Sequence, residues 1–81
     1  MEQKVREILE AAFIGMIIET ETLSDVRVSG SAIWAGFDGF DHVERQTMIR
    51  KVLREKLGDE FKQVGVLLTY TPDEIDAMNA A

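Results

Sequence analysis

A helix with both ends marked in the sequence constrains this chain more than any other feature. Asp41 stands where an N-cap belongs, and Glu44 follows three residues later. The side chain of each residue can therefore accept a hydrogen bond from the backbone N–H of the other. Gly58 supplies the C-terminal stop. Apolar residues recur at helical spacing between these marks: Met48, Ile49, Val52, Leu53 and Leu57. The pattern predicts an amphipathic helix whose apolar face belongs to a core.

The opposite face of this predicted helix is cationic. From Val43 to Leu57 there are five cations and two acids, a local charge of +3 in a chain whose net charge is −6. Three interpretations are open: a solvated helix face, a surface that contacts nucleic-acid phosphates, or a surface for an acidic protein partner. The candidate site residues are Arg45, Thr47, Arg50, Lys51 and Arg54.

The segment Phe37–Asp41 before the helix is predicted to be a turn, because Gly39 supplies backbone freedom and aspartates can hydrogen-bond their own backbone. His42 could serve as a metal ligand or a pH-sensing group, and Asp38 and Asp41 could form a carboxylate pair for acid–base work. The turn and the cap account for both aspartates, and His42 is expected to be exposed. No metal site is predicted here.

Composition limits the classes of protein further. A chain of 81 residues with 46% hydrophobic content is expected to form one domain over residues 1–81. The net charge of −6 argues against binding nucleic acid by bulk electrostatics and against attraction to an anionic membrane. The chain has no cysteine, no apolar run of membrane-spanning length and no signal-peptide pattern, so we expect a cytoplasmic protein. No nucleophile with an oxyanion donor is evident, and we expect no enzymatic activity.

The remaining segments predict a helix from Glu2 to Phe13, an edge strand from Ile14 to Thr22, a turn at Leu23–Asp25 and a second strand from Val26 to Ala35. The two strands follow each other closely and should form a hairpin. Small residues surround Gly30 in the second strand, which predicts a bulge or a close backbone approach there.

After the central helix, a further helical turn is predicted at Asp59–Lys62. The apolar run Val64–Tyr70 suits a strand covered on at least one face and partly on the other. Thr71, Pro72 and Glu74 then form a strong helix start. The predicted fold is α+β in the order helix, strand, strand, helix, strand, helix, with a three-stranded mixed sheet and helices on one face.

Trp34 ends the second predicted strand beside Phe37 and Phe40, where aromatic rings could stack a base or grip a partner. Core packing is the favoured interpretation, because Trp34 shares a strand face with Val28. A small core and an exposed apolar strand would also gain from a homodimer.

The second half of the chain resembles the BolA family of small stress-associated regulators. The resemblance rests on Phe37-Asp38-Gly39 followed by Arg45-Gln46, and on the segment from Leu68 to Ile75, which is similar to the closing strand of the family and its Thr-Pro-x-Glu helix start. It implies a fold similar to a type II KH domain and a non-enzymatic regulator that contacts nucleic acid through the central helix. It also implies an alternative, an adaptor that binds a monothiol glutaredoxin in iron–sulfur trafficking.

This chain departs from the family at the positions associated with a shared iron–sulfur cluster. Gln46 stands where the family often has histidine, a second usual histidine would fall near Gln63, and the segment Glu19–Asp25 holds neither histidine nor cysteine. Such clusters need thiolate or imidazole donors. We therefore predict no cofactor, and a glutaredoxin partner would be bound without ligands from this chain.

Overall fold

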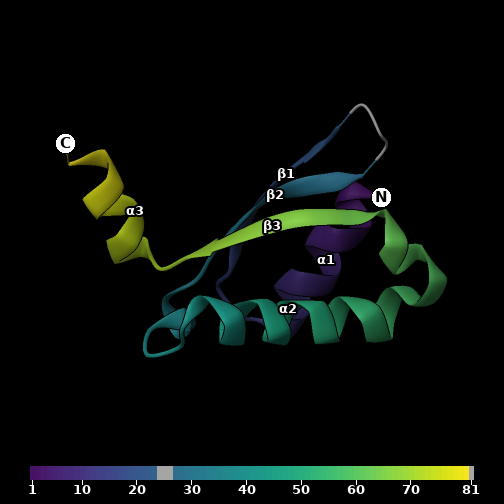
Figure 1. Cartoon of the computed structure of the whole chain (residues 1–81), viewed down its shortest axis with the longest axis horizontal. Coiled ribbons are helices and arrows are strands. Elements are labelled where there is room, and N and C mark those ends of the chain that lie inside the picture. Colours follow the sequence, from purple (N-terminus) through teal and green to yellow (C-terminus); the bar gives the residue numbers. More distant parts are fainter. Residues whose placement is uncertain (24–26, 81) are drawn as a thin grey trace.

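The computed structural model describes residues 1–23 and 27–80, and its elements follow the predicted order. They are α1 (Glu2–Ala12), β1 (Ile17–Thr22), β2 (Val28–Ile33), the 3-10 turn η1 (Ala35–Phe37), α2 (His42–Leu57), the 3-10 turn η2 (Gly58–Gln63), β3 (Val64–Tyr70) and α3 (Pro72–Asn79). Helices α1 and α2 lie on one side of the sheet, and α3 projects past the end of β3 (Figure 1). Parts of the predicted turn Leu23–Asp25 and of the predicted second strand, Val26 among them, lie outside the described residues.

The sheet has the order β1-β2-β3. Strands β1 and β2 are antiparallel, with Ile17 opposite Ile33, and β2 and β3 are parallel, with Ile33 opposite Tyr70. A hairpin therefore precedes a crossover through α2, which confirms the predicted α+β fold with its mixed sheet. Strand β1 lies at the edge, as its sequence indicated.

The small residues in β2 mark the irregularity that was predicted there. The pairing register between β2 and β3 shifts between Val28 and Gly30. A Cβ atom on Gly30 would lie 1.9 Å from the carbonyl oxygen of Glu19 in β1, far closer than two such atoms can approach. Glycine is therefore required because the neighbouring backbone occupies the space of a side chain.

Both predicted strands of the hairpin are shorter than their sequence pattern. The first begins at Ile17 because the N–H of Met16 donates to the carbonyl of Phe13 at 3.1 Å, and Gly15, with φ of 87°, completes a turn. The second ends at Ile33 because the N–H of Phe37 turns back to the carbonyl of Trp34 at 3.2 Å. Local turns override the alternation of apolar residues at both places.

The helix caps are those that the sequence predicted. In α2 the Glu44 N–H donates to Oδ1 of Asp41 at 2.8 Å, and the Asp41 N–H donates to Oε1 of Glu44 at 3.1 Å. Thr71 and Glu74 form the same reciprocal pair at the start of α3. These bonds fix where each helix begins.

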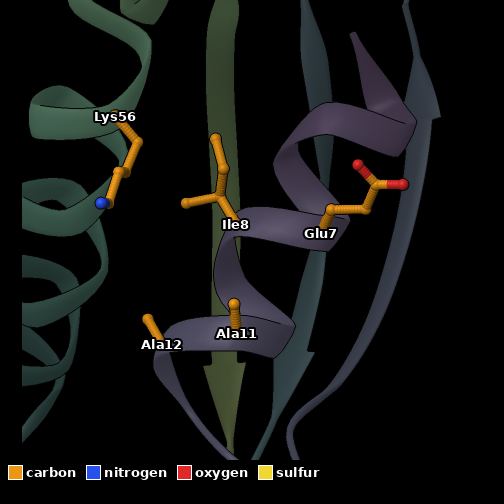
Figure 2. Close-up of a pocket in the computed structure, with 5 residues that line it drawn as sticks. All are labelled: Glu7, Ile8, Ala11, Ala12 and Lys56. Carbon is orange, nitrogen blue, oxygen red and sulfur yellow. The ribbon is translucent and has the colours of Figure 1, made fainter.

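A shallow hollow separates the outer surfaces of α1 and α2. It is lined by Glu7, Ile8, Ala11, Ala12 and Lys56. Figure 2 shows Ile8 pointing toward α2, with Lys56 on one side and Glu7 on the other. The two alanines have no bulk to fill the space between the helices, so the hollow follows from their small size.

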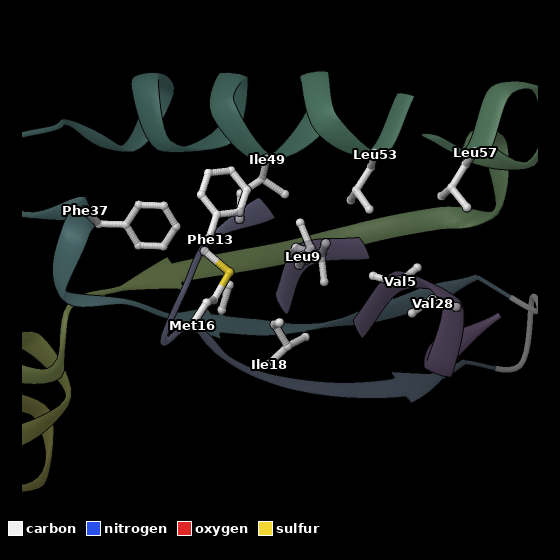
Figure 3. Packing of buried hydrophobic residues seen from close by; sticks show 12 residues of the cluster. Val5, Leu9, Phe13, Met16, Ile18, Val28, Phe37, Ile49, Leu53 and Leu57 are labelled. Atoms are coloured by element: carbon white, nitrogen blue, oxygen red, sulfur yellow. The ribbon is translucent and has the colours of Figure 1, made fainter. Parts of the chain in front are cut away.

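The core lies between the two helices and the covered face of the sheet. Figure 3 shows Ile49, Leu53 and Leu57 of α2 pointing toward α1 and the strands. The buried apolar residues are Val5, Leu9, Phe13, Met16, Ile18, Val28, Ala32, Phe37, Ile49, Leu53, Leu57 and Leu67. Met48 and Val52 are partly buried against this cluster, as the apolar face of α2 predicted, and Trp34 after β2 packs against it too.

Candidate functional site

Four of the five predicted site residues lie together on the exposed side of α2. Thr47, Arg50, Lys51 and Arg54 are all exposed and, with Glu55, line a shallow hollow on the outside of the helix. Residues three and four positions apart share one helix face, which is why the sequence could place these side chains together. We call Thr47, Arg50, Lys51 and Arg54 the basic face.

Two arginines of the basic face stack on one aromatic ring. The guanidinium carbon of Arg50 lies 5.0 Å from the ring centroid of Phe61, and that of Arg54 lies 5.1 Å from it. Phe61 comes from η2, where the chain turns back after α2. The ring attracts both cations through its quadrupole and restricts their rotamers. Two like charges held near each other on one helix face favour an anion that binds both.

Thr47 and Lys51 differ in what they can offer. The Thr47 hydroxyl donates to the carbonyl of Val43 at 2.9 Å, so its single proton is already used within the helix. Lys51 is exposed, and its ammonium group can donate three hydrogen bonds. The cations of the basic face, rather than the hydroxyl, are therefore the groups that can hold an anion.

The structure separates Arg45 from the basic face. Arg45 is only 5% exposed, and its Nε donates to the carbonyl of Phe40 at 2.8 Å. Nη1 and Nη2 donate to the two carboxylate oxygens of Glu74 in α3, at 2.7 and 3.1 Å. Its guanidinium also lies over the ring of Phe37. Four of its five N–H donors are used within the fold and the side chain is buried, so we leave Arg45 out of the candidate site.

The ion pair of Arg45 and Glu74 joins the starts of α2 and α3. The hydrogen bonds from Arg45, and after them the one from the Thr71 N–H, hold the pKa of the Glu74 carboxyl well below its ordinary value, at about 2. The same hydrogen bond with Glu74 raises the pKa of Arg45. Both groups are therefore charged at neutral pH, and the pair is a structural contact rather than a site for proton transfer.

Gln46 and Arg45 also cover the outer edge of β3. The Tyr70 carbonyl accepts from the Trp34 N–H, so by alternation the carbonyls of Leu67 and Thr69 point to the other side of β3. Nε2 of Gln46 donates to the Leu67 carbonyl at 2.6 Å, and Nη1 of Arg45 lies 3.5 Å from that of Thr69. These two residues near the start of α2 thus occupy carbonyls that would otherwise be free to pair with another strand.

The sequence also offered Trp34 as a binding residue and His42 as a metal ligand. Trp34 packs edge-to-face against Phe13 and Phe37, with ring centroids 5.2 and 5.3 Å away, and its Nε1 donates to the carbonyl of Ile14. His42 is exposed at the start of α2. Across residues 1–23 and 27–80, no group of three His, Cys, Asp or Glu side chains could hold a metal ion.

The part of the chain that the structure describes contains no helix that is both long and apolar enough to cross a membrane.

Comparisons with known proteins bear on the fold. No protein-family model matches the chain, and no curated protein matches it. Among solved structures, the chain is similar to BolA1 from Arabidopsis thaliana, with a TM-score of 0.60 and 22% sequence identity over 89% of this chain and 92% of that one. The chain therefore has a BolA-like fold, which confirms the fold that the resemblance in sequence implied.

Proposed function

We propose that this chain is a non-enzymatic, BolA-like regulator that contacts nucleic acid through the cations of the basic face, Arg50, Lys51 and Arg54. The observation that carries the proposal is the stacking of Arg50 and Arg54 on Phe61, at 5.0 and 5.1 Å. Arginines held in place lose less conformational entropy when they bind a phosphate, and their planar groups donate in pairs.

The net charge of the chain limits how it can contact nucleic acid. The net charge of −6 repels a polyanion at long range, so the cations of the basic face must act at short range against a few phosphates. The helix presents no acid between Arg50 and Arg54, and Glu55 is the one acid among the residues that line the hollow. We therefore expect weak, salt-sensitive binding with little preference for base sequence, because phosphate contacts carry no sequence information.

The proposal assigns no catalytic role to the two hollows along the helices. The hollow between α1 and α2 is lined by Ile8, two alanines and one pair of opposite charges, Glu7 and Lys56. The hollow on α2 is lined by cations, one acid and Thr47, whose proton is used by the helix backbone. Neither set pairs a nucleophile with a base.

Fluorescence anisotropy with short labelled DNA and RNA strands tests the proposal. Three cations that each neutralise a phosphate give a slope of about −2 to −3 in the logarithm of affinity against the logarithm of salt concentration. The double substitution Arg50→Glu/Arg54→Glu should abolish the binding. The matched control Lys4→Glu/Arg6→Glu makes the same charge change on α1 and should retain most of it.

Flat binding against salt, or none at micromolar protein, would refute nucleic-acid contact. Equal losses in the basic-face variant and in the α1 control would show that only total charge matters. Circular dichroism of each variant checks that the fold is retained.

A second candidate function is an adaptor that binds a monothiol glutaredoxin. The observation that favours it is the similarity of the whole fold to BolA1, together with the placement of Gln46. Its amide is committed to the Leu67 carbonyl of β3, at the position where the resemblance implies an imidazole. In this role the chain would bind its partner by surface contact and donate no ligand. Co-elution with a cluster-loaded glutaredoxin, or a shift of its visible spectrum, supports the role, and two independent elution peaks contradict it.

A further inference from the structure

The face of the sheet opposite the helices is open and carries a groove. Strand β2 provides its floor with Ser29, Gly30 and Ser31. These residues have small side chains or none, so the larger side chains of the two neighbouring strands rise above them. Two adjoining hollows share this floor, one beside β1 and one beside β3.

The two sides of the groove differ in chemistry. Glu19 and Glu21 of β1 are exposed along one side. Val66 and Leu68 of β3 form the other side, and they are 66% and 50% exposed. The strand register gives the same order across the sheet, because Ser31 lies opposite both Glu19 and Leu68. One row of carboxylates therefore faces one row of apolar side chains across a low floor.

Ile17, Ile33 and Tyr70 close one end of the groove. They lie in one row across the three strands, with Ile17 opposite Ile33 and Ile33 opposite Tyr70. Ile17 is 59% exposed, and the other two are partly buried. Arg27 lies toward the hairpin end, next to Gly65 and beyond the residues that line the groove.

We propose that this groove binds an extended polypeptide segment of a partner in which Lys or Arg residues alternate with apolar residues. An extended chain that lies along β2 points successive side chains to opposite sides, and alternate residues lie about 7 Å apart. Glu19 and Glu21 have the same spacing on one side, and Val66 and Leu68 have it on the other. Each cation of the ligand would then meet a carboxylate, while each apolar residue would cover exposed valine or leucine.

The charges and the spacing select this occupant over two others. Glu19 and Glu21 repel phosphates, so nucleic acid belongs to the basic face of α2 and not to this side of the molecule. A second copy would bring like-charged open faces together, or would offer its basic face, whose cations have helical spacing rather than the spacing of a strand. The proposal is therefore independent of the proposed function.

The probe for this proposal is a short capped peptide that alternates lysine and valine, titrated into isotopically labelled protein and followed by amide NMR shifts. We expect saturable shifts centred on Ser29, Gly30, Ser31, Val66 and Leu68. The control peptide has the same composition, with its lysines and valines in separate blocks. It should bind more weakly, because it cannot place lysines against the glutamates and valines against Val66 and Leu68 along the same stretch of the groove.

Charge reversal at Glu19→Lys/Glu21→Lys should weaken binding of the alternating peptide roughly tenfold, because two attractions become repulsions. The matched variant Glu10→Lys/Asp59→Lys carries the same change of net charge on α1 and η2 and should retain the affinity. The proposal is overturned by no saturable shift, by equal affinity for the two peptides, or by equal losses in the two variants. Concentration-dependent shifts at both the groove and the basic face, without peptide, would instead assign the groove to a second copy.

Discussion

Replacing Arg45 with methionine tests whether this side chain builds the fold or contacts a ligand. Methionine has a similar length and keeps the apolar contacts of the side-chain stem, but it cannot donate a hydrogen bond. The substitution removes the donors to the carbonyls of Phe40 and Thr69 and the paired contact with Glu74. If Arg45 is structural, Arg45→Met will lower stability and leave nucleic-acid binding by the folded protein unchanged.

The size of the effect follows from the exposure of each lost partner. Thr69 is 3% exposed, so water cannot reach its carbonyl, but the contact with Arg45 is long at 3.5 Å, and its loss costs about 1–2 kcal/mol. Phe40 is 41% exposed, so water can replace Arg45 there, and the lost charged hydrogen bond costs about 1 kcal/mol. Part of this loss of stability is offset, because methionine, unlike arginine, places no charge in the buried position. We expect a loss of roughly 2–3 kcal/mol in the free energy of unfolding.

Urea denaturation followed by the fluorescence of Trp34 measures this loss. With a slope of about 1 kcal/mol per molar urea for a small domain, the midpoint should fall by about 2–3 M. The companion variant Arg50→Met should behave in the opposite way, with little change in midpoint and a smaller salt dependence of nucleic-acid binding. An unchanged midpoint for Arg45→Met, or a loss of salt dependence equal to that of Arg50→Met, would refute the assignment.

Three further predictions follow from particular contacts. The pKa of Glu74 is lowered from 4.5 to about 2 by Arg45, so the pair stabilises the fold fully above pH 4.5 and loses this contribution as the pH falls toward 2. Denaturation midpoints across that range should fall in the unmodified chain and change less in Glu74→Gln. Phe61→Leu keeps apolar packing and removes the ring beneath the two arginines, so nucleic-acid affinity measured by anisotropy should fall a few-fold with an unchanged salt slope. Gly30→Ala places a Cβ against the Glu19 carbonyl, and urea denaturation should show a loss of at least about 3 kcal/mol or no folded state.

Features set by residues close in sequence were predictable from the sequence. Each helix cap joins residues three positions apart, so Asp41 with Glu44 and Thr71 with Glu74 could be recognised without knowledge of the fold. The close approach at Gly30 was also indicated, because three small residues in a row have few other uses within a strand.

The role of Arg45 depended on contacts distant in sequence, yet the sequence held a signal for it. Arg45 lies four residues before Ile49 and eight before Leu53, and helical spacing therefore places it on the buried row rather than on the basic face. A cation on an apolar row requires a partner for its charge and its donors. That partner, Glu74, is 29 residues away in the chain, and only the fold brings the two together.

The open face of the sheet was the part that periodicity described least well. The apolar run Val64–Tyr70 predicted a strand covered on at least one face and partly on the other, and the structure buries the face that contains Leu67. Val66 and Leu68 remain exposed on the other side. Sequence alone cannot distinguish a second layer within the chain from a surface that a partner covers, because both require apolar residues.

The hydrogen bonds from Gln46 and Arg45 to the outer carbonyls of β3 leave β1 as the edge at which another strand can pair with the sheet. An added strand finds these acceptors occupied by two side chains near the start of α2, whereas β1 forms the opposite edge of the sheet. Two copies joined through β1 would present only their blocked β3 edges outward. Edge-to-edge association would therefore stop at a pair of chains instead of continuing into a fibre, and a partly destabilised variant should accumulate dimers before larger aggregates.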